Sequence, residues 1–211
     1  MQDRTTVTRR TTGGTAGAEG ARDAMGATAP SRGVQQLLHP VVLGSIIGSA
    51  GASAFVHVNR GLLPGYGPTV ALVAWAVALA VVVWVVLLRP RTLPRTPAPA
   101  PRAGLVYVAA VVGMLVLMSL GRLALAALGH EDLQPAVVVL AVGLHFVPFA
   151  RAFRAPVFGT LGLVVAALGV LGLVAGLVAG AVLAAAAAVL TGLVMLAVIA
   201  LDQLRAAPTA A

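Results

Sequence analysis

Two ionisable side chains stand inside long apolar stretches of this sequence, and they are its first candidates for chemistry. His145 lies in the segment "GLHFVPFAR", directly after the uncharged run "PAVVVLAV", and Arg122 interrupts the run "GMLVLMSLGRLALAAL". Burial away from water penalises the charged form of such groups, so those found in apolar segments often contact a ligand or carry a proton. We therefore take His145 and Arg122 as candidate proton-sensing or ligand-binding residues.

Both side chains also have a structural interpretation. Pro148 lacks a backbone N–H and frees a carbonyl about one turn earlier, where the imidazole of His145 can donate a hydrogen bond. Arg122 can pair with Glu131 or Asp132 in the loop that follows, or extend its long side chain toward the membrane surface. We expect a helix kink or end at Pro148 in either case, and the sequence leaves both interpretations open.

The chain shows no constellation that is typical of catalysis. Cysteine is absent, which excludes thiolate chemistry, and no group of His, Asp and Glu has metal-ligand spacing. The segment "GASA" at 51–54 is similar to the nucleophile motif of rhomboid intramembrane proteases. Its Ser53 lies near one face of the membrane and His145 near the other, about 15–20 Å away across a core of about 30 Å. His57 shares a helix face with Ser53, but no oxyanion hole accompanies this pair. We predict no catalytic residue, no metal and no cofactor.

The composition explains which solvent must surround these residues. Of the 211 residues, 60 % are hydrophobic and 9 % are charged, whereas a soluble domain carries about 25 % charged residues. The mean hydropathy is +1.01, so lipid must cover much of the surface. The net charge of +8 comes from arginines alone, and they stand between apolar runs. This placement indicates charges that flank membrane segments, with the lipid bilayer as partner and no nucleic acid.

The apolar runs predict an all-α polytopic transmembrane bundle with six spans. A membrane helix needs about 20 residues, so the uncharged stretch from Pro156 to Leu201 is long enough for two helices. We place the turn between them near Gly176–Gly180, where glycine weakens the helical pattern. The expected spans are about 41–58, 68–88, 104–128, 133–150, 156–176 and 180–201. They form one domain over 39–204, between a disordered tail over 1–38 and a short tail over 205–211.

The distribution of arginine predicts the orientation of the bundle. The loop "RPRTLPRTPAPAPR" carries four arginines, and the loop after the fourth span carries Arg151 and Arg154. The alternate connectors contain Arg60 alone, an acidic pair, and no charge. Arginine accumulates on the cytoplasmic side of membrane proteins, so both termini should be cytoplasmic. We expect a multi-pass protein of a bacterial inner or cell membrane.

Small residues at intervals of four indicate where helices can approach closely. Gly44, Gly48 and Ala52 lie on one stripe of the first span, and Gly172 and Gly176 repeat the spacing in the fifth. Lipid removes the hydrophobic drive between helices, so contacts in membranes depend on such small residues. These faces predict helix packing, either within the chain or with a protein partner or second copy.

The segment "GLHFVPFARAFRAP" resembles a signature of small uncharacterised six-span bacterial integral membrane proteins. In these proteins a G-L-H-F-x-P-x-A run ends one span before an aromatic and basic loop. The resemblance covers this segment alone and implies a six-span fold without implying an activity. It draws attention to His145 and Pro148.

Three classes of function remain open. We favour a non-catalytic helix bundle that interacts with protein or lipid. The alternative is a small-solute transporter or channel with a polar site near Arg122 or His145, for which two sets of three spans suffice. That alternative predicts a water-accessible cavity lined by polar groups such as Ser49, Ser119 or Thr191. A membrane enzyme is the third class, and it predicts polar side chains that converge at one depth.

Overall fold

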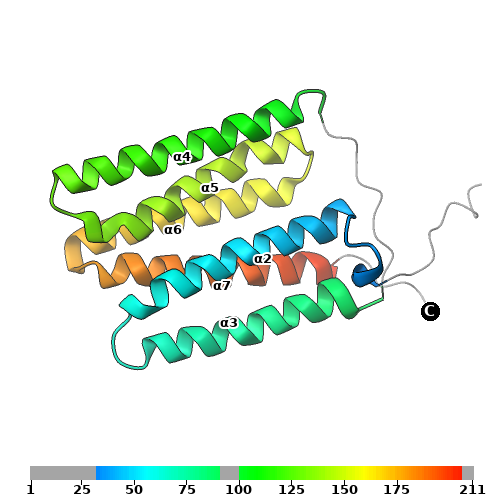
Figure 1. Cartoon of the computed structure of the whole chain (residues 1–211), viewed down its shortest axis with the longest axis horizontal. Helices are drawn as coiled ribbons and strands as arrows, with labels where there is room; N and C mark the ends of the chain where they lie inside the picture. The colour runs from blue at the N-terminus through cyan, green and yellow to red at the C-terminus, as the bar shows by residue number, and fades with distance from the viewer. Residues whose placement is uncertain (1–31, 91–99, 206–211) are drawn as a thin grey trace, which may run out of the picture.

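Six long helices dominate the part of the chain that the computed structural model describes, residues 32–90 and 100–205 (Figure 1). They are α2 (Pro40–Asn59), α3 (Gly67–Val83), α4 (Ala103–Ala127), α5 (Gln134–Ala152), α6 (Pro156–Ala179) and α7 (Val182–Arg205). All six are long and apolar enough to cross a membrane, and the described ranges contain no strand. The prediction of an all-α bundle with six spans is confirmed. Residues 1–31, 91–99 and 206–211 lie outside the description, and with them most of both predicted tails.

Proline and glycine set several helix boundaries. Pro40, Pro68 and Pro135 stand in the first turns of α2, α3 and α5, where a missing N–H costs no intrahelical hydrogen bond. Gly180 separates α6 from α7 with φ of +103°. This backbone region strongly favours glycine, so the turn falls at Gly180 and Ala181.

Four short helical segments complete the described chain. They are η1 (Gly33–Gln35), η2 (Arg60–Leu62), the π-helical segment η3 (Trp84–Leu88) and η4 (Glu131–Leu133). Within the region predicted as a tail, η1 packs against η3 at the end of α3. Gly33 is buried there, and the two segments are so close that a Cβ added to this glycine would collide with the Val86 carbonyl group.

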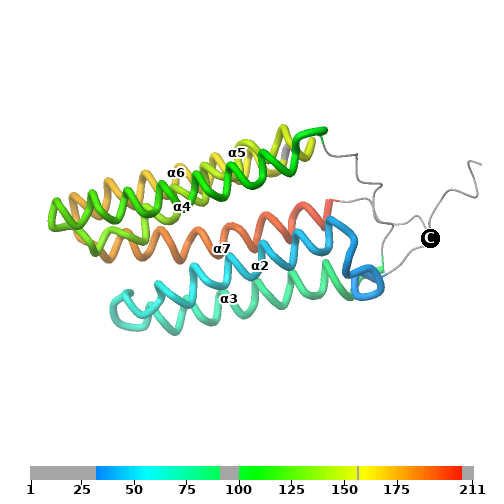
Figure 2. Tube along the Cα trace, turned by 45° about the horizontal axis from the view of Figure 1, so that its top comes forward, coloured from blue at the N-terminus to red at the C-terminus, as the bar shows by residue number. Residues whose placement is uncertain are grey.

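The six helices form two layers of three, which Figure 2 shows as two separate groups of tubes. One layer holds α4, α5 and α6, and the other holds α2, α3 and α7. The last helix joins the layers, because α7 contacts both α5 and α6 as well as α2 and α3. The third long helix along the chain, α4, packs mainly on α5. Two consecutive sets of three spans therefore do not form the two halves of the bundle.

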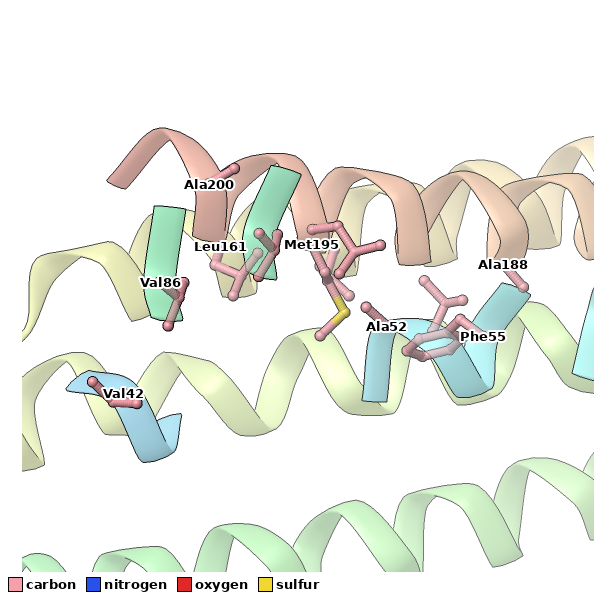
Figure 3. Packing of buried hydrophobic residues seen from close by; sticks show 12 residues of the cluster. Val42, Ala52, Phe55, Val86, Leu161, Ala188, Met195 and Ala200 are labelled. Carbon is pink, nitrogen blue, oxygen red and sulfur yellow. The ribbon is translucent and has the colours of Figure 1, made fainter. Parts of the chain in front are cut away.

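Apolar side chains fill the interior of the bundle. Figure 3 shows part of this core, in which Ala52 and Phe55 of α2 lie near Ala188 and Met195 of α7. The same buried cluster includes Leu161 of α6. The interior at the level of these residues is thus occupied by aliphatic, aromatic and thioether groups.

The closest helix contact is between α5 and α6. A Cβ on Gly143 would collide with the backbone N of Ala166, and one on Gly169 would collide with the backbone N of Leu140. A Cβ on Gly162 would stand 2.8 Å from the Gly143 carbonyl oxygen. The two backbones can approach this closely only because these positions have no side chain.

The helix α4 is the least buried of the six. Only 6 % of its apolar stretch is buried, against 22–44 % for the other five. Its inward side contacts α5 through residues such as Leu125, whereas Val112, Val116 and Leu120 on the opposite side are exposed. In a membrane this long apolar side must face lipid or another protein.

Candidate functional site

His145 lies on α5 and is half-buried. Its Nδ1 contacts the carbonyl oxygen of Val142, about one turn earlier on the same helix. A carbonyl can only accept, so Nδ1 carries the proton and donates it. The helix does not end at Pro148 but continues to Ala152. The imidazole therefore has a local hydrogen-bond partner inside its own helix.

His145 also belongs to a group of aromatic side chains at one end of α4, α5 and α6. Its ring centroid is 4.2 Å from that of Phe146 and 5.2 Å from that of Phe149. Phe149 stacks on Tyr107 of α4, and Phe146 stacks on Phe158 of α6. We call this group the aromatic cluster, with members Tyr107, His145, Phe146, Phe149, Phe153 and Phe158. Periodicity within single helices gives no signal for such a contact between helices.

Arg122 lies on α4 and is exposed. Glu131 and Asp132 belong to η4 and are also exposed. Within the described ranges, no hydrogen bond or ion pair joins Arg122 to either carboxylate. Arg122 is close to the end of α4 at Ala127, so its long side chain can extend along the helix toward the membrane surface. His145 and Arg122 stand near opposite ends of the bundle and do not form one site.

A polar contact that the sequence did not predict joins α2 to α3. The indole N–H of Trp75 donates to the Ser53 hydroxyl oxygen at 2.9 Å, and this hydroxyl donates to the Ser49 carbonyl oxygen at 2.7 Å. The His57 ring packs edge-on against Trp75 at 4.4 Å. The Ser53 proton is directed at a backbone carbonyl, so His57 is not placed to accept it as a catalytic base would.

Four other hydroxyl groups in the spans are engaged by their own helix, whereas Arg60 Nε and Gln134 Oε1 are buried without a hydrogen-bond partner among the described residues. Ser45 and Ser49 donate to carbonyl oxygens one turn earlier, as do Ser119 and Thr191. Ser49 and Thr191 are buried, whereas Ser119 is exposed on α4. The hydroxyl groups expected to line a transport cavity therefore do not converge.

The glycines and alanine predicted to mediate packing have different surroundings. An added Cβ would come 3.0 Å from Ile199 at Gly48, 2.6 Å from Ala187 at Gly172, and 2.6 Å from Leu133 at Gly176. Ala52 is buried, and a Cβ on Gly192 of α7 would collide with its carbonyl oxygen. At Gly44 an added Cβ meets open space.

Two of the hollows in the described part of the chain lie at the ends of the bundle. One has about 440 Å³ and is lined by residues 34–39. The other has about 300 Å³ and lies among Leu62, Glu131, Asp132, Pro135, Ala181 and Val182. In the described ranges, no group of three His, Asp or Glu could hold a metal ion.

The two ends of the bundle differ in charge. The starts of α2, α4 and α6 meet the ends of α3, α5 and α7 at what we call the arginine-rich end (Figure 1). Its described residues include six arginines and one acidic residue: Arg32, Arg89, Arg102, Arg151, Arg154, Arg205 and Asp202. The opposite end carries Glu131 and Asp132 with Arg60 and Arg122, so its formal charges cancel.

Comparison with known proteins adds no name to this architecture. No protein-family model, no curated protein and no solved structure matches the chain. The coordinates define a six-helix protein whose helices can span a membrane.

Proposed function

We propose that this chain is a non-catalytic multi-pass protein of a bacterial cell membrane, which acts by binding lipid or another protein at its surface. The observation that carries the proposal is the apolar interior. Val165, Ala188 and Leu196 are fully buried in it, and the buried hydroxyl groups of Ser45, Ser49 and Thr191 each donate to a backbone carbonyl of their own helix. Helices whose described interior is mainly apolar offer their outer surface for interaction.

The small-solute transporter is the other class with a definite structural requirement. It needs polar groups around a water-filled path at mid-membrane depth. Ser49 and Thr191 are buried, but Ser119 and Arg122 lie on the exposed α4. Helices α2, α3 and α4 also do not pack as a unit that could move against the other three. Both observations favour the binding protein over the transporter.

The absence of cysteine from the chain makes a direct test straightforward. Single variants Ser49→Cys and Thr191→Cys place a thiol in the interior, and His130→Cys places one at an exposed position outside the helices. We expect a membrane-impermeant maleimide to label the His130→Cys variant in native membranes and to leave both interior thiols unlabelled. All three variants should react after denaturation. Labelling of Thr191→Cys or Ser49→Cys in the folded protein would establish a water path and overturn the proposal.

A further inference from the structure

Three exposed arginines lie at the same end of α4, α5 and α6 as the aromatic cluster. Arg102 immediately precedes α4, Arg151 stands in the last turn of α5, and Arg154 lies between α5 and α6. The backbone N–H of Ala100 donates to the carbonyl oxygen of Ala152 at 3.0 Å. This hydrogen bond holds the chain before α4 beside the end of α5, and so brings Arg102 to the same corner of the bundle as the other two arginines.

No described residue neutralises these arginines. In the described part of the chain, Arg102, Arg151 and Arg154 form no ion pair. The acidic residue at this end, Asp202, lies on α7 and accepts a hydrogen bond from Gln203. Helices α4 and α6 both begin here without an acidic residue in the first turn, so their N-terminal dipoles add positive potential. The corner is thus suited to an anion.

An apolar track leads away from this corner along α4. Leu105, Val108 and Val112 are spaced by three and four residues, which places them on one side of the helix. They are 68 %, 56 % and 52 % exposed. Tyr107, in the same turn of α4, stacks on Phe149 of α5, and half of its surface is exposed. Tyrosine prefers this depth, where its ring is in the apolar region and its hydroxyl is near water.

We propose that Arg102, Arg151 and Arg154 bind the phosphate of an anionic phospholipid whose acyl chains lie along Leu105, Val108 and Val112. The positive charge of the three arginines favours an anion. The exposed apolar residues of α4, which lie at the depth of the membrane, favour an anion that carries hydrocarbon tails. A soluble phosphate would use only the first feature. The assignment deepens the proposed function and rests on it, because it names a lipid as the surface partner.

The test is native mass spectrometry of the full chain in detergent, titrated with dioleoylphosphatidylglycerol or dioleoylphosphatidylcholine. We expect the first molecule of phosphatidylglycerol to bind more tightly than the first molecule of phosphatidylcholine. A triple variant should lose this preference, with the ratio of the two affinities falling roughly five-fold for each arginine removed. Its substitutions are Arg102→Gln, Arg151→Gln and Arg154→Gln. The matched control, Arg32→Gln, Arg89→Gln, Arg205→Gln, removes the same charge from the same end and should keep the preference. A millimolar concentration of glycerol 3-phosphate should not displace the lipid.

Three results would overturn the lipid site. They are equal affinity of the unaltered protein for the two lipids, an equal loss of preference in both triple variants, and displacement by glycerol 3-phosphate. The maleimide experiment distinguishes this failure from that of the proposed function, because it reports on the interior and does not involve these arginines. Circular dichroism of each triple variant verifies that the helices are retained.

Discussion

The surroundings of His145 determine what its loss should do. Its one hydrogen bond is to Val142 on the same helix, and its ring is half-buried against Phe146 and Phe149. Removal of a locally satisfied polar group costs little, because water or lipid headgroups can solvate what remains at a helix end. Phe149 is different, since it is buried and contacts the rings of Tyr107, Phe153 and Phe158.

We therefore predict that His145→Ala lowers the free energy of unfolding by about 1 kcal/mol or less. Phe149→Ala should lower it by about 3 kcal/mol, because it leaves a cavity between α4, α5 and α6. Both values can be measured by titration of detergent-solubilised protein with sodium dodecyl sulfate, followed by circular dichroism. A larger loss for His145→Ala than for Phe149→Ala would show that the imidazole has an essential contact beyond Val142.

The hydrogen bond between Trp75 and Ser53 gives a second prediction at a single contact. Ser53→Ala and Trp75→Phe each remove one partner, and a double-mutant cycle isolates the energy that couples them. We expect a coupling of about 0.6 kcal/mol, the typical value for such bonds between membrane helices. The same titration measures it. A coupling indistinguishable from zero would mean that α2 and α3 are held together by apolar contacts alone.

The sequence identifies single candidate residues, but it does not identify the groups that they contact. The polarity of His145 and Arg122 makes both conspicuous among apolar neighbours, so the candidates are identified without a structure. Their partners are not, because a hydrogen bond to Val142 and an exposed position on α4 depend on rotamers and helix rotation. The contact between Trp75 and Ser53 joins residues on separate helices, and no spacing rule predicts it.

Among the helices, the contact of α5 with α6 depends on missing side chains. Gly143 and Gly169 each face the backbone of the other helix, and Gly162 faces the Gly143 carbonyl oxygen. The spacing of small residues in the sequence indicates Gly172 and Gly176 but also Gly44, where an added Cβ meets open space. Spacing alone identifies a smooth stripe and does not say whether a helix or lipid covers it.

Gly143→Ala is the change that tests this contact. The new methyl group collides with the backbone of Ala166, which cannot rotate away, so α5 and α6 must separate. We predict a loss of about 1–3 kcal/mol in the free energy of unfolding. The control is Gly113→Ala on α4, where an added Cβ meets nothing within 4 Å, and its effect should stay within about 0.5 kcal/mol. Equal effects of the two substitutions would contradict the close approach.

For the molecule as a whole, the number of spans follows from the sequence and the arrangement of the helices does not. Apolar length alone counts spans, because lipid requires about 20 residues per crossing. The pairing of α7 with α2 and α3, and of α4 with α5, has no comparable signal. A helix that is apolar on every side can face either lipid or protein, so periodicity does not identify its neighbours.

The charge difference between the two ends predicts how the bundle sits in its membrane. Six arginines and one acid at one end should hold that end in the cytoplasm. We therefore expect alkaline phosphatase fused after His130 to be active and green fluorescent protein fused after Arg205 to fluoresce. A phosphatase inserted after Pro64, in the connector between α2 and α3 at the same end of the bundle as His130, should also be active. The reverse pattern would leave the helix packing intact but would move Arg102, Arg151 and Arg154 away from the cytoplasmic leaflet. Because that leaflet supplies the negative surface potential, a reversed orientation would also remove the setting in which a site for anionic lipid has a use.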